Sequence, residues 1–405
     1  MQLSYEILKD ISEKYGDTFY LLDSQLFEKN YRDMLLCFRK NYSNTHIAYS
    51  YKTNYTPALC KIVEKNGGYA EIVSEMEMWL ALKVGVKPHH IYYNGPYKKK
   101  EYVEKLMCMG GHINCDSTYE VEMIEDIAKR NPQKNFSVGI RCNLDIGQEG
   151  VSRFGVGVDE LSWMIQKFNS MSNVHVTGLH SHLPYRSLES FKKRMVAVDK
   201  LVQKFSDYSW EYISLGGGYM GHIDEKMMNE FIFMPPTYKQ YADVVAVTMN
   251  EIFQKHKRKP ELIIEPGTAL VADTMMYVTR IVDIKKVKNK YIAITTGSSF
   301  GVNPSVKGIR RPVEVYSLNE NGKFYDELDM AGYTCIESDY LYKGYIGRLN
   351  RDDFVTFKNV GSYSIVMKPP FILPDVPVLG FEKEDEIYVY KKEQTIDGVF
   401  ERFTI

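Results

Sequence analysis

From about residue 45 to residue 270, short apolar runs alternate with longer segments whose apolar residues recur at helical spacing. The short runs predict strands, and segments such as STYEVEMIEDIAKR (117–130) predict helices. Eight such strands alternating with helices favour a (β/α)8 barrel, and a doubly wound open sheet is the competing fold. The eight runs are HIAYSYKTN (46–54), GGYAEIVS (67–74), HHIYYNGP (89–96), GHINCDS (111–117), FSVGIRCNL (136–144), VHVTGLHSHL (174–183), WEYISLGGGY (210–219) and ELIIEPGTAL (261–270).

The pattern changes after about residue 270. The runs there are short, β-branched and aromatic, they are separated by polar turns, and long helical patterns are absent, which predicts an all-β domain. We therefore expect an α/β protein with a TIM-like barrel over 25–270 and a β domain formed by 1–24 and 271–405. The β-domain runs are YVTRIVDIKKV (277–287), KYIAITT (290–296), RRPVEVYSL (310–318), DDFVTFKNV (352–360), SYSIVM (362–367) and DEIYVYKKE (385–393).

Composition narrows the possible functions. The chain has 405 residues, 44% of them hydrophobic and 25% charged, which is typical of a soluble globular protein. Its net charge of -1 leaves no basic excess for a nucleic-acid backbone. We find no apolar run of membrane-spanning length, and the start, MQLSYEILKDISEKYG, predicts a polar amphipathic helix without a signal-peptide core. Six cysteines without paired spacing fit reduced thiols and a cytoplasmic protein, and they argue against a zinc site.

Polar or glycine-containing tails follow the predicted barrel strands. In a barrel these carboxyl ends meet at one face, where active sites lie. Lys52 in AYSYKTNYTP is either an ordinary strand-end lysine or an amine with a covalent role, and its own stretch does not decide between them. The other tails carry Glu71 and Ser74, Asn94, Arg141 and Asn143, His180 and His182, Gly216 to Gly218, and Glu265.

Three of these tails have more than one interpretation. The triplet Gly216–Gly218 fits either an anion-binding loop or a tight strand-to-helix turn. Glu265, before a Pro-Gly turn, is either a capping residue at that turn or a buried carboxylate that pairs with a cationic ring nitrogen. His180 and His182 could ligate a metal, stack on a ring, or serve as ordinary hydrogen-bonding residues, but no partner ligand recurs at metal spacing.

Taken together, the lysine, the glycine loop and the carboxylate match the needs of pyridoxal 5'-phosphate. A lysine amine forms a Schiff base with this cofactor. A glycine loop can hold its phosphate, and a carboxylate keeps its pyridine nitrogen protonated, so that the ring accepts electrons from a carbanion.

With these motifs, the sequence resembles the barrel-type (fold type III) pyridoxal-phosphate decarboxylases, which include the diaminopimelate, ornithine and arginine decarboxylases and relatives from siderophore and antibiotic pathways. The resemblance runs nearly end to end, from FYLLDSQLF to GSYSIVM. YSYKTN resembles the cofactor-lysine motif and implies that Lys52 forms the Schiff base. The resemblance further implies the residues around the cofactor. Glu71 would lie near the lysine, and Arg153 in SRFGV would lie near the cofactor. His182 would stack on the ring, Glu265 would lie at the ring nitrogen, and Gly216, Gly217 and Gly218 would bind the phosphate.

The resemblance also gives the β domain a role. CIESD resembles the family's Cys-x-x-x-Asp motif, which makes Cys335 a catalytic residue and the candidate donor of the final proton. GSYS implies Tyr363 near the phosphate. Family members are typically homodimers in which the β domain completes the partner's active site, so we expect a homodimer acting on a small amino acid.

Three departures from the family pattern concern the substrate and the phosphate. Thr268 replaces the arginine that usually ends the EPGR motif, and Ile336 stands where an acidic residue often accepts the substrate's distal ammonium. Pro184 and Tyr185 replace a Gly-Ser that often helps hold phosphate. Because a buried ammonium without an acceptor is strongly penalised, we expect a modified or conjugated diamino acid that lacks a free distal ammonium. The residues assigned to the substrate are Thr268, Arg310, Arg311, Ile336 and Asp339.

Other functions stay open from the sequence. One is diaminopimelate decarboxylation with local compensation, and Arg310 and Arg311 in GIRRP make an anionic distal group plausible. Another is an alanine-racemase-like activity, although the Cys-x-x-x-Asp motif favours decarboxylation. A non-catalytic regulatory homologue is the third, but such a protein has no need to keep Lys52, His182, Glu265 and Cys335 together.

Overall fold

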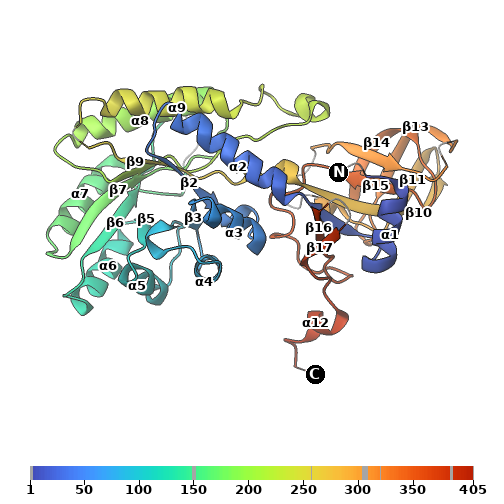
Figure 1. Ribbon diagram of the computed structural model, residues 1–405, viewed down its shortest axis with the longest axis horizontal. Helices are drawn as coiled ribbons and strands as arrows, with labels where there is room; N and C mark the ends of the chain where they lie inside the picture. Colours follow the sequence, from blue (N-terminus) through green and yellow to red (C-terminus); the bar gives the residue numbers. More distant parts are fainter. Residues whose placement is uncertain are drawn as a thin grey trace. The chain divides into compact units, whose positions relative to one another are not determined.

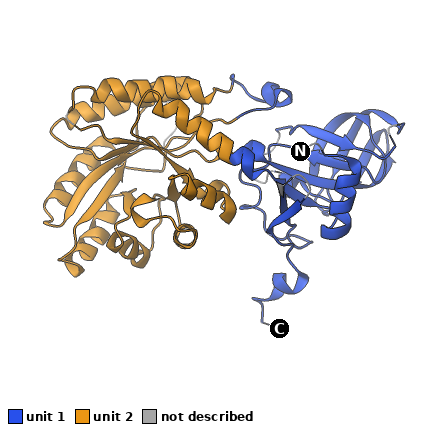
Figure 2. Ribbon diagram, viewed as in Figure 1, with its two compact units in different colours: residues 1–27, 222–234, 271–405 blue, residues 28–221, 235–270 orange. Residues whose placement is uncertain are grey.

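The chain folds into two compact units, shown in the computed structural model of Figures 1 and 2. We call residues 28–221 and 235–270 the barrel unit, and residues 1–27, 222–234 and 271–405 the β unit. The structure describes residues 3–147, 152–256, 258–302, 309–319, 321–383 and 386–404.

The barrel unit contains a closed barrel of eight parallel strands. Each strand pairs with the next, and β9 returns to β2, with Thr45 opposite Leu262. The predicted (β/α)8 barrel is thereby confirmed, and the open-sheet alternative was wrong. The strands are β2 (Thr45–Ser50), β3 (Tyr69–Ile72), β4 (Ile91–Tyr93), β5 (His112–Cys115), β6 (Phe136–Arg141), β7 (Val174–His180), β8 (Tyr212–Ser214) and β9 (Glu261–Ile264).

Helices cover the outside of the barrel (Figure 1). They form where the sequence repeats apolar residues at helical spacing, as in α6, which buries Val121, Ile124 and Ile127. Serine or threonine side chains cap the first turns of several helices, for example Ser74 before α4 and Thr237 before α9. The helices are α2 (Ser24–Arg39), α3 (Pro57–Lys65), α4 (Glu75–Lys83), α5 (Lys100–Cys108), α6 (Tyr119–Arg130), α7 (Val158–Asn169), α8 (Leu188–Lys204) and α9 (Tyr238–Phe253).

Stacked aromatic and imidazole rings fill the amino end of the barrel. Tyr69 stacks between His46 and His90, with ring centroids 4.6 and 4.3 Å away. Tyr92 stacks on His112 at 4.5 Å and meets Tyr212 edge-on at 5.1 Å. We call these six residues the ring layer. Such contacts add to the area that large rings bury, so this end of the barrel is a packed core.

The β unit is built on a nine-stranded sheet. The helix α1 (Tyr5–Tyr15) packs Leu8 and Ile11 into its core beside Phe19, Val278 and Phe354. The predicted second, β-rich domain is thus present. Its strands are β1 (Phe19–Leu22), β10 (Met275–Val287), β11 (Lys290–Thr295), β12 (Val313–Tyr316), β13 (Phe324–Ala331), β14 (Tyr340–Arg348), β15 (Phe354–Phe357), β16 (Val378–Lys383) and β17 (Glu386–Lys391), and its short helices are α11 (Ser299–Val302) and α12 (Ile396–Phe400). The short helix α10 (Thr268–Val271) spans the boundary between the two units.

The stretch SYSIVM was predicted as a strand, and this was wrong. Tyr363 has a φ of 57°, which lies in the left-handed region and breaks an extended chain. The Ser364 carbonyl accepts hydrogen bonds from the N–H groups of Met367 and Lys368, as in a turn. β-branched and aromatic composition alone therefore does not decide between a strand and a turn in this stretch.

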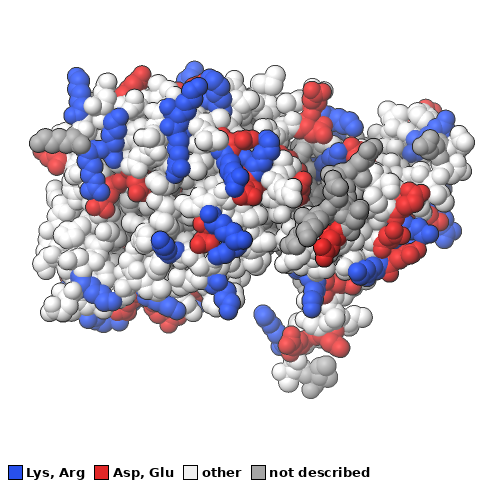
Figure 3. Space-filling view, viewed as in Figure 1, with Lys and Arg blue, Asp and Glu red and all other residues white. Residues whose placement is uncertain are grey.

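The surface carries charges of both signs. Figure 3 shows acidic and basic side chains interspersed over the visible face of each unit. This distribution agrees with the net charge of -1 and offers no broad basic field on that face. Among the described residues, no helix combines the length and apolar character that a membrane crossing requires.

Candidate active site

Lys52 lies in the short turn η1 (Tyr51–Thr53), directly after the carboxyl end of β2. Its Nζ contacts the Glu71 carboxylate on the neighbouring strand and lies 3.5 Å from Ser50 Oγ. The Lys52 side chain is 31% exposed, whereas Glu71 is only 1% exposed. A buried carboxylate therefore anchors an amine that a small molecule can still reach.

Glu265, directly after β9, sits at the centre of a buried hydrogen-bond network. Its Oε1 accepts from Ser214 Oγ at 2.7 Å and from Asn94 Nδ2 at 3.1 Å, and its Oε2 lies 3.2 Å from His180 Nε2. Burial raises the pKa of this carboxyl, but His180, Lys52 and Ser214 outweigh burial and hold the pKa well below its usual range. The network therefore keeps an ionised carboxylate inside the barrel.

Asn94 links the two carboxylates of the site. Its Nδ2 donates to Glu265 and, also at 3.1 Å, to Glu71 Oε1. Asn94 Oδ1 in turn accepts from Asn114 Nδ2, and Asn114 Oδ1 accepts from Tyr212 Oη, both at 2.7 Å. A continuous chain of side-chain hydrogen bonds thus runs from the ring layer to the two carboxylates.

His180 and His182 serve different partners. Because the ionised Glu265 carboxylate can only accept, His180 Nε2 carries the proton that it donates, and its Nδ1 is buried with no partner among the described residues. The Gly217 N–H donates to His182 Nδ1 at 2.7 Å. Burial and the nearby Lys52 charge hold the pKa of His182 well below its usual value, so this imidazole is neutral. Among the described residues, no group of three or more histidine, cysteine, aspartate or glutamate side chains could hold a metal ion.

The loop Gly216–Gly218 follows β8 and requires glycine. Gly216 and Gly218 have φ values of 63° and 95°, and a Cβ on Gly217 would lie 2.8 Å from the Glu265 carbonyl oxygen. Two of the three N–H groups are already used, by Ser214 Oγ and His182 Nδ1. The Gly218 N–H has no acceptor among the described residues, so the loop offers less backbone donation to an anion than the triplet alone suggests.

The segment with Arg153 lies at the carboxyl end of β6. Arg141 Nη1 pairs with Asp116 Oδ1 at 3.0 Å, and the Gly155 N–H donates to the same oxygen at 3.3 Å. Arg153 is exposed, with its guanidinium 4.1 Å from the ring centroid of Phe154.

The remaining predicted site residues, apart from Thr268 at the start of α10, belong to the β unit. Cys335 and Ile336 are exposed in the turn before β14. Asp339, which ends this turn, is buried and accepts hydrogen bonds from Ser298, Ser299 and Thr334, so its carboxylate holds the turn together.

Three further residues of the β unit were assigned to the site. Arg310 is exposed near Glu230, with Nε and Oε1 3.9 Å apart. Arg311 Nη1 donates to the Asn359 carbonyl at 2.8 Å. Tyr363 lies in the turn described above. Their roles, like that of Cys335, stay predictions.

Sequence reasoning missed the residues that support the site. Asn114, Tyr212 and Ser214 lie within strands, where an apolar run hides them. Two glycines could have signalled the tyrosine, because a Cβ at Gly139 or Gly178 would lie about 2 Å from Tyr212 ring or hydroxyl atoms. An isolated glycine inside a strand marks such a close approach.

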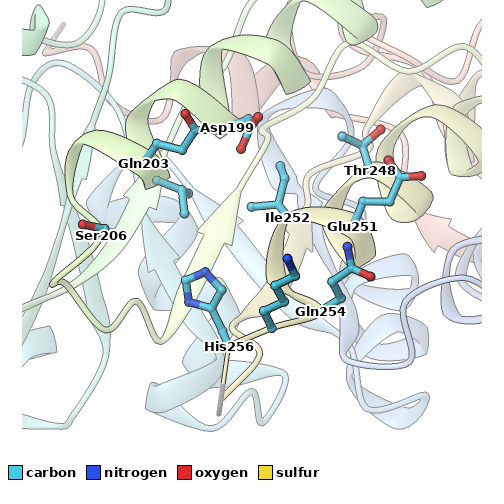
Figure 4. Close-up of a pocket in the computed structure, with 10 residues that line it drawn as sticks. Asp199, Gln203, Ser206, Thr248, Glu251, Ile252, Gln254 and His256 are labelled. Atoms are coloured by element: carbon cyan, nitrogen blue, oxygen red, sulfur yellow. The ribbon is translucent and has the colours of Figure 1, made fainter.

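A separate groove of about 390 Å³ lies between the C-terminal parts of α8 and α9 (Figure 4). Asp199, Gln203, Glu251 and His256 are among the residues that line it. Helices of a βα unit run back toward the amino ends of the strands, so this groove lies away from the network around Lys52.

Comparisons with known proteins agree with this fold. A diaminopimelate decarboxylase from Aquifex aeolicus is 23% identical over 97% of this chain and 93% of the relative. The solved structure of the diaminopimelate decarboxylase from Methanocaldococcus jannaschii has a TM-score of 0.87 at 22% identity, covering 98% and 94% of the two chains. A lysine/ornithine decarboxylase from Vibrio vulnificus, solved with putrescine, has a TM-score of 0.77 at 14% identity, covering 93% and 98%.

The fold and the strand-end residues define a barrel enzyme that binds pyridoxal phosphate. Residues 28–272 match the pyridoxal binding domain of the pyridoxal-dependent decarboxylases, and the chain belongs to this family. It is a pyridoxal-phosphate-dependent amino acid carboxy-lyase. The site fits the cofactor: a reachable amine at Lys52, an ionised buried carboxylate at Glu265, and a glycine loop in which Gly216 and Gly218 have positive φ values and the Gly218 N–H has no acceptor among the described residues.

Proposed function

We propose that this enzyme decarboxylates, at the α-carbon, a diamino acid whose distal nitrogen is acylated, amidated or otherwise uncharged. The observation that carries the proposal is the turn Cys335–Asp339. Ile336 presents an apolar side chain, 37% exposed, next to the predicted catalytic thiol. The carboxylate of Asp339 is already engaged by three residues of its own unit. A free distal ammonium would find no acceptor from Ile336 or Asp339, and unpaired polar groups are strongly disfavoured in a closed site.

The barrel residues have separate tasks in this proposal. Lys52 would hold the cofactor through its amine, and this amine would also be available to move a proton near the α-carbon. The ionised Glu265 carboxylate would stabilise a proton on the ring nitrogen, and the neutral His182 imidazole would be suited to pack against the ring. When bound, the cofactor supplies an acceptor for the electron pair that CO2 leaves at the α-carbon. Cys335 donates the proton that completes the amine.

The substrate test is CO2 release by the cofactor-loaded protein. The panel comprises lysine, ornithine, arginine, both diaminopimelate stereoisomers, and acylated or amide-linked conjugates of small diamino acids. We expect release from conjugates only, and none from Lys52→Ala. Efficient turnover of free lysine or diaminopimelate would contradict the proposal.

A substitution at Ile336 sharpens the test. Ile336→Glu restores an acidic acceptor and should shift kcat/KM toward free diamino acids by at least about tenfold, the equivalent of one charge-assisted hydrogen bond. The matched control is Ile346→Glu, which changes another exposed isoleucine of the β unit. An equal shift in both variants would show a general charge effect.

Diaminopimelate decarboxylation is the second candidate. The observation that favours it is that curated relatives with this name align with 96–97% of the chain at 23–24% identity. Arg310 and Arg311 could then receive the distal carboxylate. Release of CO2 from one diaminopimelate stereoisomer alone, lost in Arg311→Gln, would establish this function.

We further propose a homodimer in which Cys335 serves the partner's barrel. Lys52 and Cys335 belong to different units of the chain, which agrees with shared sites. In a two-fold dimer, mixing inactive Lys52→Ala and Cys335→Ala protomers leaves one intact site in each mixed dimer. We expect about a quarter of wild-type activity after subunit exchange. No recovery despite proven exchange would place both residues in one chain's site.

A further inference from the structure

Arg194, in the first half of α8, is the largest fully buried side chain described, with 1% exposure. Its guanidinium reaches three backbone carbonyls. Nη1 donates to Gly217 O at 3.1 Å, and Nη2 donates to Leu183 O at 2.9 Å and to Tyr185 O. One side chain therefore ties the segment after β7 to the glycine loop after β8.

No acidic side chain neutralises this guanidinium among the described residues. The Arg194 guanidinium carbon lies 4.1 Å from the ring centroid of Phe191, and Arg194 Nε has no hydrogen-bond partner among the described residues. Burial lowers the pKa of Arg194 to about 10, so it remains charged at neutral pH. A buried charge is costly unless an opposite charge pairs with it. Carbonyl dipoles alone leave the full positive charge uncompensated.

The charge lies directly behind the glycine loop. A Cβ built on Gly218 would come within 3.3 Å of Arg194 Nη2. The N–H groups of Gly216 and Gly217 are already donated to Ser214 and His182, which leaves the loop with little backbone donation for an anion. The glycine loop therefore has few free N–H groups to offer an anion, and the unpaired positive charge of Arg194 lies next to it.

We propose that Arg194 is a positioning residue for the cofactor's phosphate monoester. It fixes the two loops that border the phosphate position, and its charge attracts and balances the phosphate dianion from behind Gly217 and Gly218. The inference rests on the cofactor of the family and goes beyond the substrate proposal, because cofactor binding is measured without substrate.

The experiment compares pyridoxal phosphate with pyridoxal, which lacks the phosphate. Dissociation constants of both are measured on the cofactor-free full chain by absorbance and by tryptophan fluorescence. For Arg194→Gln we expect the affinity for pyridoxal phosphate to fall at least tenfold, while that for pyridoxal stays within twofold. Arg194→Lys keeps the charge, and its preference for the phosphorylated form should stay within threefold of wild type. Inorganic phosphate should raise the melting temperature of the cofactor-free wild type and not that of Arg194→Gln.

The matched control is Arg39→Gln. Arg39 Nε also donates to a backbone carbonyl, that of Thr45 at 2.9 Å, but at the amino end of β2. This variant should bind both ligands like wild type. Equal weakening of both ligands in Arg194→Gln, or no weakening of either, would overturn the proposal. If Arg194→Gln does not fold, Arg194→Lys decides: a tenfold loss of phosphate preference overturns the proposal, and retention supports it.

Discussion

The two ends of the barrel use similar residues for opposite purposes. At the carboxyl end, His180 donates to an ionised Glu265 and His182 accepts from a loop N–H. At the amino end, His46, His90 and His112 lie in the ring layer against tyrosine faces. The first pair is held by directional hydrogen bonds beside a reactive amine, whereas the other three serve mainly as flat, packable rings.

The difference follows from strand direction. Parallel strands bring loops with free side chains together at the carboxyl end, and the amino end closes as core. A histidine's position along its strand therefore tells more about its task than its presence in the sequence does.

Removing the amine at the carboxyl end should abolish catalysis without unfolding the barrel. Lys52→Ala should lower kcat at least about ten-thousandfold, roughly 5.5 kcal/mol on the barrier, because Lys52 is the residue that we propose holds the cofactor aldehyde. The cofactor-free protein should still fold, but its melting temperature should fall, because the buried Glu71 carboxylate loses its paired cation. Lys61→Ala, on α3, is the control lysine and should remain fully active. Substantial activity in Lys52→Ala would remove this residue from the mechanism.

Removing a ring at the amino end should destabilise the fold and leave catalysis nearly unchanged. Tyr92→Ala deletes a buried ring that contacts both His112 and Tyr212, and the free energy of unfolding should fall by about 3–5 kcal/mol. Denaturant unfolding measures this loss, and kcat of the protein that remains folded should stay near wild type. Tyr119→Ala, with 73% exposure, is the control and should cost no more than about 0.5 kcal/mol. A Tyr92→Ala variant that keeps its stability but loses its activity would contradict the assignment of packing to the amino end and catalysis to the carboxyl end.

Acid should weaken the amino end through its histidines. Burial first, and neighbouring positive groups second, lower the pKa values of His46 and His90 to about 4; burial chiefly does the same for His112. Because the unfolded chain binds these protons from about pH 6.5 downward, stability is fully present above pH 6.5 and is lost as the pH falls toward 4. After allowance for solvent screening, we expect a loss of about 2 kcal/mol between pH 7 and 4.5.

Denaturant midpoints measured across this pH range test the prediction. His112→Phe should flatten the profile, because it keeps a ring against Tyr92 and removes a titrating group. The exposed His256→Phe is the control and should follow wild type. If His112→Phe is as acid-sensitive as wild type, His112 is not a source of the loss.

The smallest effect should come from the link between the two ends. Tyr212→Phe keeps the ring but removes the hydroxyl that donates to Asn114 at 2.7 Å. We expect about 1 kcal/mol of lost stability and less than about a threefold change in kcat, because Asn94 keeps its bonds to both carboxylates. Tyr208→Phe, an exposed hydroxyl bonded to Asn169, is the control. A loss of kcat above tenfold would show that the link tunes the carboxylates.

The repeating pattern was enough to predict the barrel, because each βα unit carries its own periodicity. The β unit was harder to predict. The strand β13 has the sequence FYDELDMA, and its acidic residues hide the alternation that signals a strand. Conversely, SYSIVM has strand-like residues but forms a turn around Tyr363. Strand pairing depends on partners far along the chain, which a local pattern does not reveal.

The site residues also differ in whether the sequence alone could predict them. Strand-end residues such as Lys52, Glu71 and Glu265 stand in motifs, and the structure brings them into one hydrogen-bonded group. Asn114 and Arg194 act from within a strand and a helix, where they look like ordinary polar residues. Only the fold shows that one orients Asn94 and that the other lies behind the glycine loop.

The division of the chain into two units limits how its segments can be exchanged by recombination. The segment 222–234 is inserted between β8 and α9 of the barrel, yet it belongs to the β unit, where Met227 Sδ lies 3.3 Å from Asn359 Nδ2. The backbone thus passes between the units at 27/28, 221/222, 234/235 and 270/271. A recombination that exchanges the barrel as one block also replaces part of the other unit's core. Such an exchange therefore leaves the β unit intact only if the incoming 222–234 segment packs against the resident β unit as well as its own does.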